Sequence, residues 1–285
     1  MKKKIISTIF GFVISLFLAI VLLSGALCLF ANNTVCAPQY LTQIAEKSGF
    51  TDELYEEIRY DWENFISITG VEDPASIMPM LTKEQVSKDV LETLKSAYEG
   101  KSSLNTDELK TQLETKVREY AHSNNINATP EAELEENIAD LVNACIEDYQ
   151  QAVSIPLLPT ILGAVGKVAP LLMPAAAATA VAALILLVFL FFLQTERKNT
   201  LYYAAISAGT NAVILIGLPA LAAAYQIVKR LPFEASALKM LVTAYVQALL
   251  DQLQFTGLLF LGAAVLLIAV YVSLVFLFKK KPANV

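Results

Sequence analysis

The chain has 285 residues, of which 55% are hydrophobic, and its mean hydropathy is +0.53. This apolar share exceeds that of soluble domains and excludes a soluble globule. The net charge of -6 is unevenly spread, because residues 31–172 hold 24 acidic and 10 basic residues, while the remainder is net positive. An acidic segment of that size repels polyanions, so nucleic acid is excluded as its ligand.

Four apolar runs are each long enough to cross a bilayer, which takes about 20 residues. They lie within residues 1–30, 174–194, 201–227 and 256–278. Basic residues form three clusters beside them, at Lys2, Lys3 and Lys4, at Arg197 and Lys198, and at Lys279, Lys280 and Lys281. Short cationic flanks stay on the cytoplasmic side. We therefore predict a multi-pass protein of the cell membrane with cytoplasmic termini.

The first run could be confused with a cleaved signal peptide, because three lysines precede it. Its apolar stretch from Ile5 to Phe30 is longer than the apolar region of about 7 to 15 residues in such peptides. We predict an uncleaved signal-anchor. Residues 31–172 are then extracytoplasmic.

The segment between the first two spans has the pattern of amphipathic helices. Thr82 and Gln85 have capping-box spacing, as do Asn105 and Glu108, and Thr129 with Pro130 has the pattern of a third helix start. Apolar residues recur at helical spacing in three stripes. One stripe precedes these starts, at Leu54, Ile58, Trp62 and Phe65. The other two follow the second and third starts, at Leu109, Leu113, Val117 and Tyr120, and at Leu134, Ile138, Leu141, Cys145 and Tyr149. No run alternates as a strand does. The fold class predicted is all-α, with an extracytoplasmic helical bundle.

Two segments next to the spans are harder to place. Residues 155–173 are apolar but contain three prolines and Lys167, and a central lysine costs about 2.5 to 3.5 kcal/mol in a span. We interpret them as interfacial or re-entrant. Residues 228–255 are predicted as an external amphipathic helix that leads into the last span.

The predicted organisation follows from these assignments. It comprises a tail and first transmembrane helix at 1–30, an acidic helical domain at 31–154, the interfacial or re-entrant segment at 155–173, a second span at 174–194, a cytoplasmic loop at 195–200, a third span at 201–227, the external helix at 228–255, a fourth span at 256–278 and a cytoplasmic tail at 279–285.

Catalytic motifs are incomplete in this sequence. His122 is the sole histidine, which argues against a His-rich metal site or relay. The stretch from Gly100 to Ser102 resembles the end of a phosphate-binding loop but has Lys95 where glycine is needed. Ser236 and Lys239 match a Ser-x-x-Lys motif without its Lys-Thr-Gly partner. We predict no catalytic, cofactor or metal site and no enzyme.

Acidic clusters occur at two predicted helix starts. They comprise Asp52, Glu53, Glu56 and Glu57, and then Glu131, Glu133, Glu135 and Glu136. Carboxylates there complement the helix dipole, which is the interpretation we favour. Binding of a divalent cation is the alternative.

Two cysteines lie near the ends of the predicted external domain. A bridge between Cys36 and Cys145 would form in an oxidising compartment and would constrain a long loop. The alternative is three reduced thiols, with Cys28 at the membrane edge.

The third span contains the strongest polar residue within the apolar runs, Asn211. Ala208 lies on the same helix at small-residue spacing, and Pro219 is expected to kink it. Close helix packing with an interhelical hydrogen bond is the ordinary interpretation, and lining of a pore is the alternative. None of the four runs contains Asp, Glu, Lys, Arg or His, which argues against an ion-coupled transporter.

These features predict a non-enzymatic membrane protein whose external domain binds a protein, peptide or envelope ligand. The predicted cytoplasmic segments are too short for a kinase or nucleotide-binding module, so a membrane protein partner or a second copy is expected to receive the signal. The alternative is a channel or transporter component that uses residues 155–173 and the third span.

Overall fold

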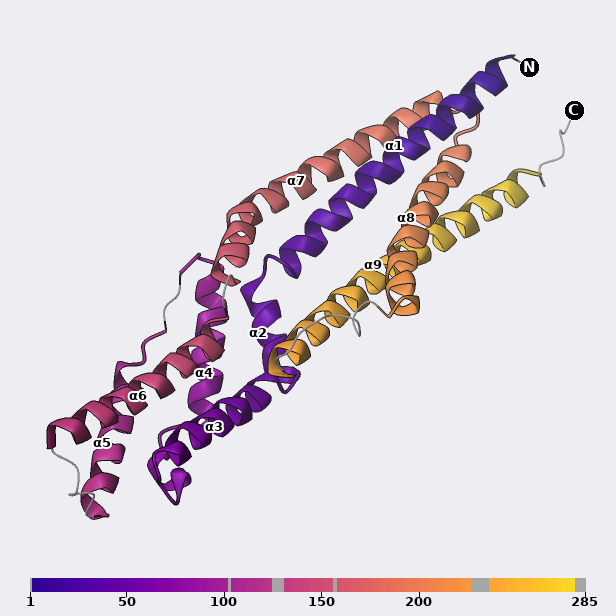
Figure 1. Cartoon of the computed structure of the whole chain (residues 1–285). Coiled ribbons are helices and arrows are strands. Elements are labelled where there is room, and N and C mark those ends of the chain that lie inside the picture. The colour runs from indigo at the N-terminus through magenta and orange to yellow at the C-terminus, as the bar shows by residue number, and fades with distance from the viewer. Residues whose placement is uncertain (1, 102–103, 125–130, 156–157, 227–235, 280–285) are drawn as a thin grey trace, which may run out of the picture. The chain divides into compact units, whose positions relative to one another are not determined.

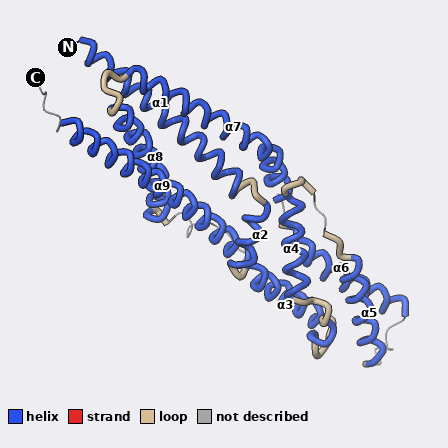
Figure 2. The backbone as a smooth tube through the Cα atoms, turned by 180° about the vertical axis from the view of Figure 1, so that it is seen from behind, coloured by secondary structure: helices blue, strands red, loops and turns tan. Residues whose placement is uncertain are grey.

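The computed structural model describes residues 2–101, 104–124, 131–155, 158–226 and 236–279 (Figure 1). Regular structure within these ranges is entirely helical (Figure 2), which confirms the all-α prediction. The helices are α1 (Lys2–Asn33), α2 (Pro38–Lys47), α3 (Phe50–Ile68), the 3-10 helix η1 (Pro74–Ile77), α4 (Lys83–Ala97), α5 (Asp107–Ser123), α6 (Glu131–Ser154), α7 (Leu158–Leu193), α8 (Asn199–Ala224) and α9 (Ser236–Lys279).

The chain divides into two compact units. The apolar unit comprises residues 1–35, 168–231 and 246–285, and the acidic unit comprises residues 36–167 and 232–245. The boundary between residues 167 and 168 falls inside α7, and the boundary between residues 245 and 246 falls inside α9. Each of these helices therefore begins in the acidic unit and continues in the apolar unit.

Within the described residues, four helices are long and apolar enough to cross a membrane, which confirms the membrane and transmembrane predictions at the level of helices. They expose large apolar side chains, such as Phe12 at 61%, Phe192 at 78% and Val213 at 74%. Such surfaces suit a hydrocarbon environment. A helix also pairs its own backbone groups, which a bilayer requires because lipid tails supply no hydrogen bonds.

The acidic unit is built around an aromatic and aliphatic core. Trp62 of α3 and Tyr149 of α6 are fully buried, with ring centroids 6.2 Å apart. The stripes expected from the sequence supply much of this core, including Leu54, Ile58, Leu113 and Cys145. Burial of one such side chain contributes about 1.5 to 3 kcal/mol.

Helix starts agree only in part with the expected caps. Thr82 precedes α4, and its Oγ1 accepts a hydrogen bond from the Gln85 amide at 3.2 Å, as predicted. The next helix starts one residue later than expected, because Thr106 takes the N-cap position. The side chain of Asn105 instead accepts from the Asp107 amide at 2.9 Å, so it forms a turn that leads into α5. The expected start at Thr129 and Pro130 lies outside the described residues.

The prolines in residues 158–193 do not break α7. The helix runs without interruption past Pro170 and Pro174. Gly163 and Gly166 serve close packing instead, because a Cβ atom on Gly166 would clash with the carbonyl oxygen of Tyr98. A Cβ atom on Gly163 would lie 2.9 Å from the Gly100 Cα atom. The position of residues 155–173 relative to a bilayer stays a prediction.

The expected external helix and last span form one helix, α9, over the described residues. Residues 228–235 lie outside the described part of the chain. The first turns of α9 place Ala237 and Leu241 in the core of the acidic unit, where they are 0% and 4% exposed. Leu162, in the first turns of α7, belongs to the same core. The acidic unit is thus completed by the first turns of two helices that continue as apolar spans.

Candidate functional site

The first turn of α9 is held by two carboxylates of α3. Ser236 donates through its Oγ to Glu53 Oε1 at 2.9 Å, and the Ala237 amide donates to Glu57 Oε1 at 3.0 Å. The first amides of a helix lack partners within the helix and carry partial positive charge. Glu53 and Glu57 therefore stabilise the start of α9 in the manner of an N-cap, although they belong to another helix.

Aromatic contacts extend this junction along α9. Tyr245 lies edge-on to Tyr40 of α2, with ring centroids 6.3 Å apart. Tyr98, at the end of α4, is 7% exposed, and burial is the main cause that raises the pKa of its hydroxyl. We define the α9 junction as Tyr40, Glu53, Glu57, Ser236 and Tyr245. It joins α2 and α3 to the start of α9, which lies far from both in the sequence.

A second cluster of polar groups lies at the edge of the core, between α4 and α6. Tyr149 donates from its hydroxyl to Asp89 Oδ2 at 2.7 Å, and Gln85 Nε2 donates to Asp89 Oδ1 at 2.9 Å. Next to Tyr149, Asp148 has a buried Oδ2 atom without a hydrogen-bond partner. Desolvation, together with the charge of Asp61, raises the pKa of Asp148 from 3.8 to about 6.

The surroundings of Asp89 favour a structural role for this cluster. The adjacent cavity has a volume of about 210 Å³ and includes Thr93 and Glu108 in its lining. Small-molecule sites usually occupy about 300 to 1,000 Å³. Within the described ranges, no group of three or more His, Cys, Asp or Glu side chains has a geometry suited to a metal ion. We assign the cluster to the stability of the acidic unit.

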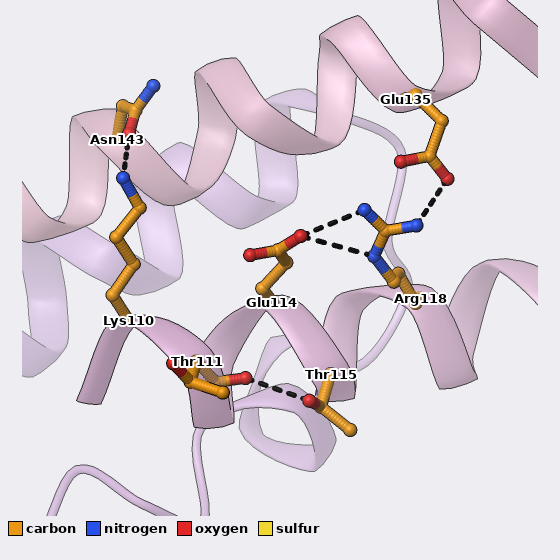
Figure 3. Close-up of polar contacts among 7 residues, drawn as sticks. All are labelled: Lys110, Thr111, Glu114, Thr115, Arg118, Glu135 and Asn143. Carbon is orange, nitrogen blue, oxygen red and sulfur yellow. Dashed lines mark hydrogen bonds and ion pairs between the residues drawn. The ribbon is translucent and has the colours of Figure 1, made fainter. Parts of the chain in front are cut away.

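Acidic side chains on the surface of α5 and α6 form ion pairs (Figure 3). Arg118 contacts both Glu114 and Glu135, and Lys110 Nζ donates to Asn143 Oδ1 at 2.9 Å. The side chains of Arg118 and Glu135 are 41% and 43% exposed. Exposed pairs of this kind contribute about 0 to 1 kcal/mol. They join α5 to α6.

A polar seam connects α1 and α8 inside the apolar unit. Ser15 Oγ donates to the Tyr203 carbonyl at 3.1 Å, and Ser207 Oγ donates to the Ser15 carbonyl at 2.7 Å. Toward the start of α1, Gln194 Nε2 donates to the Ser7 carbonyl at 3.3 Å. Gly11 allows the Gln194 side chain to approach α1 closely. A Cβ atom added at this position would lie 2.5 Å from Gln194 Nε2. Without a hydrophobic drive between helices in lipid, small residues and such bonds hold spans together.

Asn211 lies one turn beyond Ser207 on α8 and is fully buried. Neither polar atom of its amide has a hydrogen-bond partner in the described structure, so the expected interhelical bond is not formed. The α1 stripe of Ser7, Gly11 and Ser15 continues to Ala19, whose side chain offers no polar group. The hydrogen bonds between α1 and α8 are made instead by Ser15 and Ser207.

The remaining residues of the third-span prediction lie at buried positions. Ala208 and Ala212 are 4% and 1% exposed, in line with a small-residue packing face. Pro219 is also buried and lies within α8, which continues past it to Ala224. The serine stripe of α1 was missed from the sequence, although its spacing of four residues repeats the small-residue pattern recognised in α8.

All three cysteines are free thiols, so the expected bridge between Cys36 and Cys145 is not formed in this structure. Cys36 Sγ lies 3.9 Å from the Val165 carbonyl oxygen. Cys145 faces the core of the acidic unit and is 0% exposed. Burial, followed by the charge of Asp148, raises the pKa of Cys145 to about 12.

The other motif residues lie at ordinary surface positions. His122 is exposed in the last turn of α5. Lys101 pairs with Glu99 at 2.8 Å, and Ser102 is outside the described residues. Ser236 bonds Glu53 at the α9 junction, while Lys239 is exposed.

Comparisons with protein-family models, with curated proteins and with solved structures gave no match.

Asp148 makes the stability of the acidic unit depend on pH. Its folded pKa of about 6 exceeds the ordinary 3.8, so between these values the folded state keeps a proton that the unfolded state releases. Stability therefore falls as pH rises through this window. We expect Asp148→Asn to raise the free energy of unfolding by about 1 to 2 kcal/mol at pH 7.5 and to leave it nearly unchanged at pH 4.

The fluorescence of Trp62 measures this effect, because the chain has one tryptophan and it is buried in the acidic unit. Urea unfolding of the full chain in detergent micelles would be followed at both pH values. Asp140→Asn on the exposed face of α6 is the matched control and should change neither curve. Equal stabilisation by Asp148→Asn at pH 4 and pH 7.5 would contradict the assignment.

Proposed function

We propose that the chain is a non-enzymatic, multi-pass protein of the cell membrane that acts as a sensor, accessory protein or scaffold. Its acidic unit lies outside the cytoplasm and binds a protein, peptide or envelope ligand. The first turns of α7 and α9 belong to the core of that unit and continue as apolar spans, and this observation carries the proposal. In this proposal, a change that a ligand makes in the core reaches the spans through α7 and α9.

The orientation rests on charge. The basic clusters flank the apolar runs on one predicted side, and short cationic segments remain cytoplasmic. Lys198 of the turn between α7 and α8 belongs to these clusters. This arrangement supports an extracytoplasmic location for residues 31–172.

The charge of the acidic unit also favours one chemical class of ligand. Residues 31–172 contain 24 acidic and 10 basic side chains, which generates a negative potential over the unit. Complementary potentials raise association rates and exclude wrong partners. A basic protein surface or basic peptide is the favoured ligand.

The second candidate, a channel or transporter component, draws support from the buried amide of Asn211 and the polar seam next to it. Polar residues within a span mark substrate pathways in many membrane proteins. A re-entrant pore segment is usually built from broken helices, so the uninterrupted course of α7 through residues 158–173 weakens this candidate.

Labelling of single cysteines in intact cells tests the location of the acidic unit. The background carries Cys28→Ser, Cys36→Ser and Cys145→Ala, and its Trp62 emission should match that of the parent chain. We expect a membrane-impermeant maleimide to label Lys101→Cys, an exposed position in the acidic unit, and to spare Arg197→Cys in the turn after α7. Both should react after permeabilisation. The reverse pattern in intact cells would invert the proposed orientation.

Crosslinking in intact membranes tests the proposed coupling. We expect one membrane protein, or a second copy of the chain, to be captured reproducibly by the parent. Loosening the α9 junction with Glu53→Gln and Glu57→Gln should alter that capture, while the matched pair Glu56→Gln and Glu63→Gln on α3 should not.

Ion flux through vesicles that contain the purified protein separates the two candidates. If the parent chain conducts ions and Asn211→Leu does not, the channel candidate would be favoured over the proposed function. Capture that is unaffected by any of these variants would remove the support for coupling through α9.

A further inference from the structure

The apolar unit contains a groove between α1, α7 and α9 with a volume of about 400 Å³. This volume falls within the range of small-molecule sites, about 300 to 1,000 Å³. Three helices that are each long and apolar enough to cross a membrane supply its walls. The surrounding solvent of such helices is lipid, so lipid is the molecule present at the highest concentration beside the groove.

The lining of the groove changes from apolar to polar along two helices. On α1 it proceeds from Val21 and Leu22 to Asn33 at the end of the helix, and Thr34 follows in the next turn. On α9 it proceeds from Phe260 and Leu259 back to Thr256 and Gln252, toward the start of that helix. The groove therefore has apolar walls over most of its length. Hydroxyl and amide groups lie at one end of it, near the end of α1 and toward the start of α9.

Two features of the lining restrict the occupant further. No charged side chain is among the described residues that line the groove, so the rim matches uncharged or zwitterionic polar groups better than a lone charge. On α7 the wall consists of Ala176, Thr179 and Ala180, small side chains that leave room for a chain of methylene groups. Gly25 of α1 lies close to Thr179. A Cβ atom added at Gly25 would lie 2.6 Å from the Thr179 Oγ1 atom.

We propose that this groove binds one acyl chain of a membrane lipid whose head group is uncharged or zwitterionic. The acyl chain lies against Leu22, Leu259 and Phe260, and the polar part of the lipid meets Asn33, Gln252 and Thr256. A bound chain fills space that the three helices leave open, so the lipid acts as a packing element of the apolar unit. The proposal does not depend on the orientation of the acidic unit or on its ligand.

Native mass spectrometry of the full chain tests the lipid site. The protein is reconstituted into phosphatidylcholine vesicles, extracted in a neutral detergent and examined for retained phosphatidylcholine. We expect one lipid per chain. Ala180→Phe places a ring in the groove and should lower retention by about tenfold or more, which corresponds to about 1.4 kcal/mol.

Ala178→Phe is the matched control, because Ala178 is an exposed residue of α7 that does not line the groove. It should retain lipid as the parent does. Gln252→Leu, at the polar rim, should lower retention without loss of the folded Trp62 signal.

Three results would overturn the proposal. Equal retention by Ala180→Phe and Ala178→Phe would show that the bound lipid lies elsewhere. A parent chain free of lipid would show that the groove holds none. A dimer that dissociates in Ala180→Phe would show that a second copy, rather than a lipid, fills the groove.

Discussion

The core of the acidic unit is closed by the first turns of α7 and α9, and this sharing of helices constrains the rest of the molecule. Leu162, Ala237 and Leu241 exclude water from that core, while later residues of the same helices are apolar enough for a bilayer. The carboxylates of Glu53 and Glu57 satisfy the first turn of α9. The proposed coupling uses this continuity of the two helices from the core into the apolar unit.

The two units are held together internally by different forces. In the acidic unit, removal of aromatic and aliphatic surface from water dominates, as at Trp62 and Tyr149. In the apolar unit, lipid is as apolar as leucine, so helix association relies on close packing and hydrogen bonds. The seam of Ser15 and Ser207 supplies both, since small side chains permit close approach and the hydroxyls bond carbonyls of the opposite helix.

The polar groups without partners in the two units carry different costs. Asp148 can neutralise its buried oxygen by taking up a proton, which is why its pKa rises to about 6. The amide of Asn211 cannot do this, because it has no ionisable proton near neutral pH. Its burial therefore costs free energy in the structure as it stands. The unpaired amide of Asn211 is the observation that supports the channel alternative.

Periodicity and composition predicted much of the fold. The stripes that include Ile58 and Leu113 are buried as expected, because local spacing determines which residues share a helix face. The bonds of Glu53 and Glu57 to α9 were not predictable, since they join residues about 180 positions apart. Acidic residues near a helix start fit their own helix dipole equally well, so composition gave no reason to assign them to another helix.

Glycines and prolines illustrate a second limit of local reasoning. In residues 155–173 they resemble helix breakers, yet α7 continues because a proline removes only one intrahelical bond and adjacent structure can compensate. Gly163 and Gly166 are explained only by the backbone that packs against them, at Tyr98 and Gly100. The sequence carries no signal for such a contact between distant segments.

The central claim, that α9 is one helix from the acidic core into the apolar unit, is tested most directly by a nitroxide scan. Single labels at each position from Met240 to Thr256 would be measured in phosphatidylcholine vesicles. Mobility should vary with the helical period of about 3.6 residues across the whole window, without interruption at Tyr245 and Val246. A run of uniformly mobile labels at that point would contradict the claim, because it would place a flexible joint where a continuous helix is required.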